Sequence, residues 1–396
     1  MSKPDASNAA SGRRRKAETE VVTAGRNPLA HHGAVNPPVY HVSTLIHPTM
    51  ESLEKRTQPY AYGRRGSPTT QALSDAINRL EGGAGCVLTP SGYAAVTLAL
   101  MAVAGSGDHV LVADNAYGPT RIFCDKTFSR FGVETTYYDP TIGASVADLM
   151  RPNTRAVFCE SPGSLTFEVQ DIPAIAEVAH KRGAVVIADN TWATPLLFDA
   201  FAHGVDISLH AATKYIVGHS DAMLGVVTAN AATLKQLRET HGNLGLCVGP
   251  DDVYLGQRGL RTLAVRLKQH QETALALAHW LQRRKEVARV LYPALPDDPG
   301  HRLWQRDFKG ASGLFGVVLK PVSREALAAM LDNLELFGMG WSWGGYESLI
   351  VPSHINRTAR PFQAEGPVLR IHAGLEAIDD LIADLDAGFE RLNNAA

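Results

Sequence analysis

The sequence has few of the features that mark metal-binding, redox or secreted proteins. Its four cysteines, Cys86, Cys124, Cys159 and Cys247, lie far apart and form no Cys-x-x-Cys pair. This spacing argues against a zinc ribbon or a dithiol redox motif and agrees with a reducing compartment. The fifteen histidines include no His-Glu-x-x-His pattern. We therefore expect no metal ion and a cytoplasmic location.

The sequence also lacks long hydrophobic runs and carries little net charge. No run of eighteen apolar residues occurs, so we expect no transmembrane helix. The N-terminus carries the basic cluster RRRK at residues 13–16 but lacks the apolar core of a secretory signal. A formal net charge of -2 gives no long-range field for nucleic acid or anionic lipid. We expect neither partner, and we interpret the basic cluster as part of a solvated, disordered tail.

What the sequence does contain fits a two-domain α/β protein. At 396 residues and 45% hydrophobic composition, the chain is long enough for two large cores. Short apolar runs at residues 110–114, 156–160, 184–189 and 225–228 alternate with helical patterns, which indicates a mainly parallel sheet covered on both faces. Three of these runs end in an acid, as expected where strand ends face a ligand.

The pattern changes near residue 260. A long amphipathic helix over residues 265–287 leads to strand patterns at 313–320 and 368–372, with helices at 324–331 and 375–392. Such a mixture indicates a smaller α+β domain. The predicted organisation is a tail and irregular arm at residues 1–65, a large domain at 66–260 and a small domain at 261–396.

One lysine stands out, in the run DISLHAATKYIVGHS at residues 206–220. Lys214 follows a largely apolar segment and precedes a glycine turn. An amine held partly out of water has its charged form disfavoured, so its pKa falls and it becomes nucleophilic toward a carbonyl. The alternative is an ordinary lysine at the end of a strand. All fifteen positions nevertheless resemble the site at which the Cys/Met-metabolism (transsulfuration) family attaches pyridoxal 5′-phosphate.

This resemblance covers the chain from about Tyr60 to Glu376 and implies a fold, a cofactor and partners. The implied fold is that of fold-type I (aspartate aminotransferase-like) enzymes, with a mainly parallel, seven-stranded-type sheet and a smaller α+β C-terminal domain. The implied cofactor is pyridoxal 5′-phosphate on Lys214. The implied partners are a small-molecule amino-acid substrate and further copies of the chain, in a homotetramer made of two active dimers.

A Ser-Gly step in the run TPSGYAAV at residues 89–96 opens an apolar helix. Free N–H groups and the positive end of the helix dipole make such a start a phosphate seat, and Gly92 lets the chain approach an anion without a Cβ clash. The alternative is N-capping by Ser91 alone. The resemblance implies that Gly92 and Tyr93 hold the cofactor phosphate through their N–H groups, with Ser91 and Thr213 beside it.

Two further residues follow predicted strands and suit the cofactor ring. Asp189 ends a strand 25 residues before Lys214, and a carboxylate there can keep the pyridine nitrogen protonated. A turn-capping aspartate is the alternative. Tyr117 follows the strand that ends at Asp114, and its ring is either core packing or, as the resemblance implies, a stacking partner of the cofactor.

The run YGRRGSPT at residues 62–69 supplies an arginine fork and a phenol that suit a phosphate dianion. A solvated basic turn is the alternative. The resemblance implies that Tyr62 and Arg64 reach the cofactor, and Tyr62 also the substrate, in a neighbouring subunit.

Arg370 is the candidate for substrate binding. A charge inside an apolar strand needs a partner, which is either an amino-acid carboxylate or an internal salt bridge. The resemblance implies the substrate α-carboxylate, with Ser342 and Trp343 lining the same pocket.

Gly340-x-Ser342-x-Gly344 also matches a hydrolase nucleophile elbow, but no Asp lies between Ser342 and His372 and the Trp-rich flanks are poor helix starts. Within the family, the spellings YGRRG, ESPGS and SWGG favour β-elimination from cystathionine or another cysteine S-conjugate, with γ-acting relatives as the alternative. Lys214 is then expected to remove the Cα proton. Either Lys214 or Tyr117 is expected to donate a proton to the leaving sulfur, so that homocysteine departs as a thiol.

Overall fold

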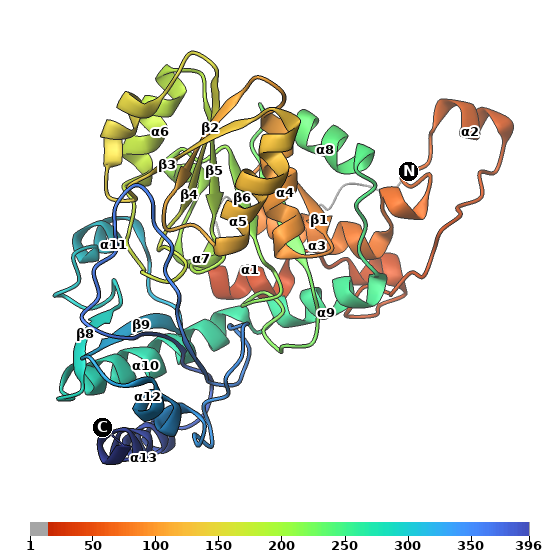
Figure 1. Cartoon of the computed structure of the whole chain (residues 1–396). Helices are drawn as coiled ribbons and strands as arrows, with labels where there is room; N and C mark the ends of the chain where they lie inside the picture. The colour runs from red at the N-terminus through yellow and green to blue at the C-terminus, as the bar shows by residue number, and fades with distance from the viewer. Residues whose placement is uncertain (1–14, 396) are drawn as a thin grey trace.

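The computed structural model (Figure 1) describes residues 15–395, so most of the predicted tail lies outside the described residues. A seven-stranded sheet forms the centre of the larger part. β7 runs opposite to the other six strands, which share one direction, so the predicted mainly parallel sheet is confirmed. In sheet order the strands are β1 (Gly85–Thr89), β7 (Gly225–Ala229), β6 (Ile207–His210), β5 (Val185–Asp189), β4 (Thr154–Glu160), β2 (His109–Ala113) and β3 (Glu134–Tyr138).

The central strands read as continuous apolar runs because both faces of the sheet are covered. In β2, Val110 and Val112 pack into the core beneath α4 and α8, whereas Leu111 packs into the core beneath α6. The helices of this part are α3 (Pro68–Glu81), α4 (Gly92–Val103), α5 (Gly118–Ile122), α6 (Ile172–Lys181), α7 (Thr194–Leu197), α8 (Leu234–Asn243) and α9 (Pro250–Leu260).

The smaller part is a four-stranded antiparallel sheet with helices, as the mixed pattern predicted. Its strands, in sheet order, are β10 (Leu349–Pro352), β11 (Val368–His372), β9 (Leu314–Leu319) and β8 (Val287–Leu291). The helices are α10 (Leu263–Gln282), α11 (His301–Asp307), α12 (Arg324–Leu331) and α13 (Ile378–Ala395). The helix predicted over residues 265–287 ends earlier, at Gln282, because Val287 already pairs with β9.

The N-terminal arm is more ordered than predicted. Two short helices, α1 (Ala17–Thr23) and α2 (Met50–Lys55), occur in the segment expected to be irregular. Val21 is buried against α3 and α10, and Arg261 donates hydrogen bonds to the carbonyls of Val21 and Ala24. By contrast, α2 lies at the end of a loop that projects away from both sheets (Figure 1).

The boundary predicted at residue 260 falls between α9 and α10. One continuous apolar cluster nevertheless includes Val157 of the large sheet and Phe315 of the small one. The two parts therefore share a core, and the strand ends that carry Glu160 and Asp189 face the junction. No helix in the described residues is long and apolar enough to cross a membrane.

Candidate active site

Lys214 lies in the turn after β6, and its surroundings change its chemistry. Its Nζ donates a hydrogen bond to Ser342 Oγ at 2.8 Å and lies 5.4 Å from the ring centroid of Trp343. Burial, helped by the Arg370 guanidinium, lowers the pKa of the Lys214 amine to about 8. A substantial fraction of the amine is therefore neutral near pH 8, and the neutral form attacks carbonyls.

Two glycines let the chain pack closely around this lysine. Gly218 has a φ of +72°, and a Cβ there would lie 2.1 Å from Arg266 Nη1. Gly344 has a φ of +83°, and a Cβ there would lie 2.9 Å from Tyr215 N. Both positions require glycine, so the loop carrying Ser342 can lie directly against the backbone of the lysine turn.

A cavity of about 350 Å³ opens beside Lys214 and collects most of the predicted site residues. A larger cavity of about 570 Å³ lies elsewhere between the two sheets and lacks the lysine. The predicted residues that line the smaller cavity are Ser91, Gly92, Tyr93, Tyr117, Asp189, Thr213, Lys214, Trp343 and Arg370. Ser342 contacts the site through its hydrogen bond with Lys214. These residues come from segments as far apart as positions 91 and 370, so the fold itself assembles the site.

The helix start at Ser91 fits both interpretations of the sequence. Ser91 Oγ accepts a hydrogen bond from Ala94 N at 3.1 Å and so caps α4. The N–H groups of Gly92 and Tyr93, in the first turn, have no intrahelical acceptor and remain available for an anion. Gly92 also has a packing role that was not predicted, because a Cβ there would lie 2.3 Å from the Ala211 Cβ. The glycine makes room for the lysine turn as well as for an anion.

Two acids lie side by side at the carboxyl edge of the sheet. Asp189 accepts a hydrogen bond from Thr191 N at 3.0 Å, and burial raises the pKa of its carboxyl. Glu160 is its neighbour in the strand register, and burial together with the Asp189 charge raises the pKa of Glu160. Glu160 was not among the predicted site residues, although its position at the end of an apolar run was a usable signal.

Tyr117 stands over this edge with 45% of its surface exposed. Its backbone N–H donates to Glu160 Oε2 at 2.7 Å. Burial and the Glu160 charge raise the pKa of the Tyr117 phenol, so the hydroxyl stays protonated at neutral pH. Thr213, on the other side of the cavity, uses its hydroxyl to accept from Leu224 N at 2.9 Å and to donate to the Leu224 carbonyl at 3.2 Å.

Arg370 lies in the middle of β11 with one edge of its guanidinium occupied. Nη2 donates to the carbonyls of Gly340, Trp341 and Ser342, each at 3.1 Å. Among residues 15–395 no acid forms an ion pair with Arg370, so the internal salt bridge considered above is not found. Burial lowers the pKa of Arg370 to about 10, which leaves it charged at neutral pH and able to bind an anion in the cavity.

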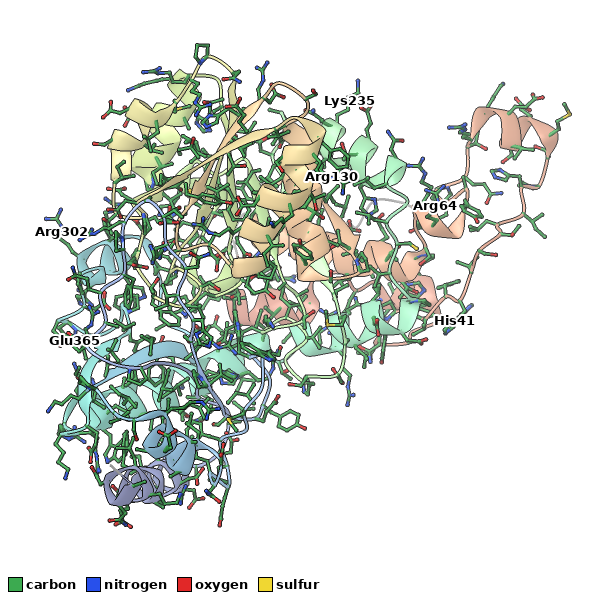
Figure 2. All side chains as sticks on the ribbon, in the orientation of Figure 1. His41, Arg64, Arg130, Lys235, Arg302 and Glu365 are labelled. Carbon is green, nitrogen blue, oxygen red and sulfur yellow. The ribbon has the colours of Figure 1, made fainter. Side chains whose placement is uncertain are left out.

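Tyr62 and Arg64 do not lie at this cavity in the same chain. Arg64 is at the base of the arm (Figure 2), where its Nη1 donates to the carbonyl of Gly242 at 3.2 Å. Its guanidinium carbon lies 5.7 Å from the ring centroid of Tyr62. A contribution of these two residues to a lysine site would have to be made in another copy of the chain.

Residues 15–395 contain neither a nucleophile elbow at Ser342 nor a cluster of metal-ligating side chains. Ser342 lies in a loop whose next element is β10, so the strand–turn–helix of a nucleophile elbow is missing there. His210 pairs with buried Glu81, and His219 Nδ1 lies 2.7 Å from the Val217 carbonyl oxygen, so both histidines have structural partners. Within the described part of the chain, no group of three or more metal-ligating side chains occurs.

The cavity brings together a nucleophilic lysine, a partly buried acid and a helix start. An α/β enzyme needs these groups to hold pyridoxal 5′-phosphate, with the lysine as the point of covalent attachment. Residues 18–390 match the family described as Cys/Met metabolism PLP-dependent enzyme, and the chain belongs to this family. The predicted family, its fold-type I architecture and its cofactor are therefore confirmed.

Similar proteins include enzymes with different reactions. The chain is 48% identical over 391 residues to the cystathionine β-lyase of Escherichia coli K12, covering 96% of this chain and 99% of that protein. It is 42% identical over 395 residues to the L-alanine/L-glutamate racemase of Wolbachia pipientis wMel, covering 95% and 98%. The crystal structure of cystathionine γ-synthase from Xanthomonas oryzae pv. oryzae with aminoacrylate and cysteine is 34% identical, covers 97% of this chain and 100% of its own, and superposes with a TM-score of 0.90.

Proposed function

We propose that this enzyme cleaves the Cβ–S bond of L-cystathionine, and of other cysteine S-conjugates, by β-elimination. With cystathionine and water the products are homocysteine, pyruvate and ammonia. The observation that carries the proposal is the Lys214 amine, with its lowered pKa, facing the same cavity as the carboxylate-binding candidate Arg370. The 48% identity to a cystathionine β-lyase over almost the whole chain supports this reaction among those known in the family.

Each part of the cavity has a group suited to one part of the cofactor. The N–H groups of Gly92 and Tyr93, with the hydroxyl of Ser91 beside them, would hold the phosphate. The Thr213 hydroxyl lines the same cavity and would join them by turning its proton from the Leu224 carbonyl to the phosphate. Asp189 would pair with the pyridine nitrogen, and the ring of Tyr117 would stack on the cofactor ring. When bound, pyridoxal 5′-phosphate supplies an electron sink for the charge left at the substrate Cα.

Arg370 and the loop that carries Ser342 and Trp343 would orient the substrate. Its Nε and Nη1 have no hydrogen-bond partner among residues 15–395, which leaves one edge of the guanidinium for the substrate α-carboxylate. Ser342 fixes the position of the Lys214 amine through its 2.8 Å hydrogen bond. Trp343 lines the cavity and would limit the access of water to a bound substrate.

Lys214 and Tyr117 would move the protons. A lysine with a pKa near 8 can accept the Cα proton and release it again near neutral pH. The Tyr117 phenol, whose pKa is raised, keeps its proton and can donate it to the leaving sulfur. Either group can protonate the leaving thiolate to give the thiol, because both line the same cavity.

The product identifies the reaction, because β- and γ-acting relatives share this scaffold. The purified enzyme with pyridoxal 5′-phosphate is incubated with L-cystathionine, and the keto acid is identified. Pyruvate is expected. Formation of 2-oxobutyrate would assign the enzyme to the γ-acting branch. Interconversion of L- and D-alanine without any keto acid would point to the reaction named for the Wolbachia relative.

We further propose a cytoplasmic homotetramer of two active dimers, in which Tyr62 and Arg64 complete the lysine site of the neighbouring subunit. Neither residue lines the cavity of its own chain, and Figure 2 shows Arg64 at the base of the arm. Ile46 and Met50 on the same arm are 86% and 75% exposed, as expected of apolar side chains that a neighbour covers. Sedimentation analysis of the holoenzyme tests the assembly, and a monomeric, fully active enzyme would contradict it.

A further inference from the structure

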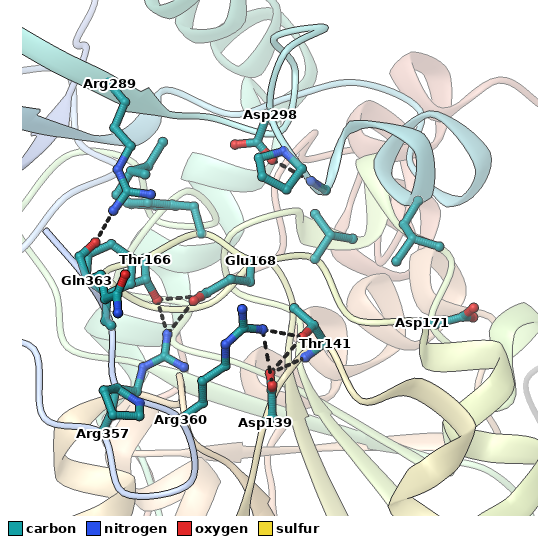
Figure 3. Close-up of a pocket in the computed structure, with 18 residues that line it drawn as sticks. Asp139, Thr141, Thr166, Glu168, Asp171, Arg289, Asp298, Arg357, Arg360 and Gln363 are labelled. Carbon is teal, nitrogen blue, oxygen red and sulfur yellow. Dashed lines mark hydrogen bonds and ion pairs between the residues drawn. The ribbon is translucent and has the colours of Figure 1, made fainter.

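A long loop from the small sheet lies against the large domain near Tyr117. This loop, residues 353–367, connects β10 to β11, and we call it the strap. Figure 1 shows it rising from the small sheet along the side of the large one. The strap forms one wall of the 570 Å³ cavity drawn in Figure 3. Its contacts with the large domain include hydrogen bonds to Asp114, at the start of the short segment that leads to Tyr117.

The first anchor of the strap is the carboxylate of Asp114, at the end of β2. The Asp114 side chain is fully buried and accepts hydrogen bonds from Thr358 N at 2.8 Å and Ala359 N at 2.7 Å. It also pairs with Arg121, on the helix that Tyr117 opens. A buried carboxylate with backbone donors and an arginine is a strong, charge-assisted attachment. It joins the strap to a residue three positions before Tyr117.

The second anchor is Arg357, whose side chain is 5% exposed. Its guanidinium pairs with Glu168 Oε1 at 2.7 Å and also contacts Thr166, as Figure 3 shows. The other oxygen of Glu168 accepts a hydrogen bond from Asn115 Nδ2 at 3.4 Å. Asn115 follows Asp114 directly, so the second anchor reaches the segment of the first anchor through Glu168.

The far end of this segment is fixed from inside the lysine cavity. Tyr117 N donates to Glu160 Oε2 at 2.7 Å, and Gln170 Nε2 donates to the Glu160 carbonyl at 2.8 Å. No hydrogen bond to the Tyr117 hydroxyl occurs within residues 15–395. The position of the Tyr117 ring is therefore set through its backbone, between the strap on one side and Glu160 on the other.

We propose that Asp114 and Arg357 are positioning residues, through which the strap of the small domain fixes the Tyr117 ring over the cofactor. The proposal rests on the proposed function in one respect, because it takes Tyr117 as the stacking partner of pyridoxal 5′-phosphate. Asp114 and Arg357 themselves do not line the lysine cavity. Their effect on cofactor binding and turnover must then pass through residues 114–117.

The strap also provides a matched control. Arg360 Nη1 pairs with Asp139 Oδ2 at 3.3 Å and contacts Thr141, both outside the Tyr117 segment (Figure 3). Arg360→Gln therefore loosens the strap at a neighbouring point but leaves both anchors intact. If the strap only stabilises the junction of the domains, this variant and the anchor variants should behave alike.

The first test compares Asp114→Asn with Arg360→Gln and the wild type. The affinity for pyridoxal 5′-phosphate is measured by titrating apo-protein and following tryptophan fluorescence, and kcat and KM are measured on the holoenzyme. For Asp114→Asn we expect cofactor affinity to fall about tenfold and kcat to fall about 10- to 100-fold, because a small misplacement of a contacting group has effects of this size. KM should change little, and Arg360→Gln should match the wild type.

The decisive measurement is a double-mutant cycle with Tyr117→Ala. If Asp114 acts through Tyr117, Asp114→Asn should have no further effect on cofactor affinity once the ring is gone. Additive effects would overturn the proposal. Arg357→Gln breaks the second anchor and serves as an independent variant if Asp114→Asn does not fold. It should weaken cofactor binding in the same way, and an unchanged affinity in Arg357→Gln would equally contradict a positioning role.

This experiment separates the strap from the proposed reaction. Cofactor affinity is measured on the apo-protein and does not depend on which substrate is cleaved. If the effects of Asp114→Asn and Tyr117→Ala are coupled but cystathionine gives no pyruvate, the proposed reaction is wrong and the role of the strap stands. If cystathionine gives pyruvate but the two substitutions have additive effects on cofactor affinity, the role of the strap is wrong and the proposed reaction stands.

Discussion

At the scale of single residues, the surroundings of Lys214 set it apart from the other lysines. The Lys214 amine is partly buried, donates a hydrogen bond to Ser342 and interacts with the charge of Arg370. By contrast, the Lys268 side chain on α10 is 77% exposed. We expect Lys214→Ala to abolish the visible absorption of the holoenzyme and to lower kcat by several orders of magnitude, because the covalent attachment and the proton acceptor are both lost. Lys268→Ala should leave both unchanged. A Lys214→Ala variant that kept the absorption band and turnover would contradict the assignment.

The pKa of Lys214 predicts how attachment of the cofactor depends on pH. Burial lowers this pKa from the ordinary value of 10.5 to about 8, so deprotonation occurs at lower pH than in an exposed lysine. The rate at which apo-protein attaches pyridoxal 5′-phosphate should rise with pH through a midpoint near 8 and then level off. The measurement is stopped-flow absorbance across a pH series. A midpoint near 10 would show that the amine is not desolvated.

Residue patterns predicted much of the site, but not the contacts between distant segments. The run around Lys214, the helix start at Ser91 and the strand end at Asp189 were readable because each is local. Glu160 ends an apolar run, as Asp189 does, but its place beside Asp189 in the strand register becomes visible only in the fold. The packing of Gly92 against Ala211 could not be predicted for the same reason, since the two residues lie far apart in the sequence.

At the scale of elements, the close approach of α4 to the lysine turn depends on Gly92. An added Cβ would lie 2.3 Å from the Ala211 Cβ, so Gly92→Ala must push the helix start away from the turn. We expect a loss of about 1–3 kcal/mol in the free energy of unfolding, as for overpacked cores, together with weaker cofactor binding. Chemical denaturation and cofactor titration measure the two effects.

Gly105→Ala is the matched control, because an added Cβ at Gly105 has no atom within 4 Å. Its stability and cofactor affinity should equal those of the wild type. If Gly92→Ala behaved like this control, the close contact between α4 and the lysine turn would not exist in solution.

The strands that sequence patterns predicted are those buried on both faces. β2, β4, β5 and β7 read as apolar runs because neither face meets water. β3 reads ETTYY and lies at the edge of the sheet, with Glu134 exposed, so it lacks this signal. The short helix α1 depends on burial of Val21 against distant helices, which no local pattern reveals.

At the scale of the whole molecule, the site should be shared between subunits. Arg64 lies outside the lysine cavity of its own chain. In a dimer, each site should therefore combine Lys214 of one subunit with Arg64 of the other. When the Arg64→Ala and Lys214→Ala variants are co-expressed, half of the dimers should be mixed, and each mixed dimer should have one intact site. About a quarter of the wild-type activity should then return.

Recovery in the mixed sample is measured as pyruvate release per subunit, with each variant alone as its control. If Arg64 served the site of its own chain, no mixed dimer would contain an intact site and no activity would return. The same result would follow if the enzyme were active as a monomer.

The central claim is that the Lys214 site breaks the Cβ–S bond of cystathionine. The most direct test follows the products of L-cystathionine by mass spectrometry in the wild type and in Lys214→Ala. The wild type should release pyruvate and homocysteine in equal amounts, and Lys214→Ala should release neither. Release of 2-oxobutyrate and cysteine by the wild type would contradict the claim, since those products arise only when the Cγ–S bond breaks.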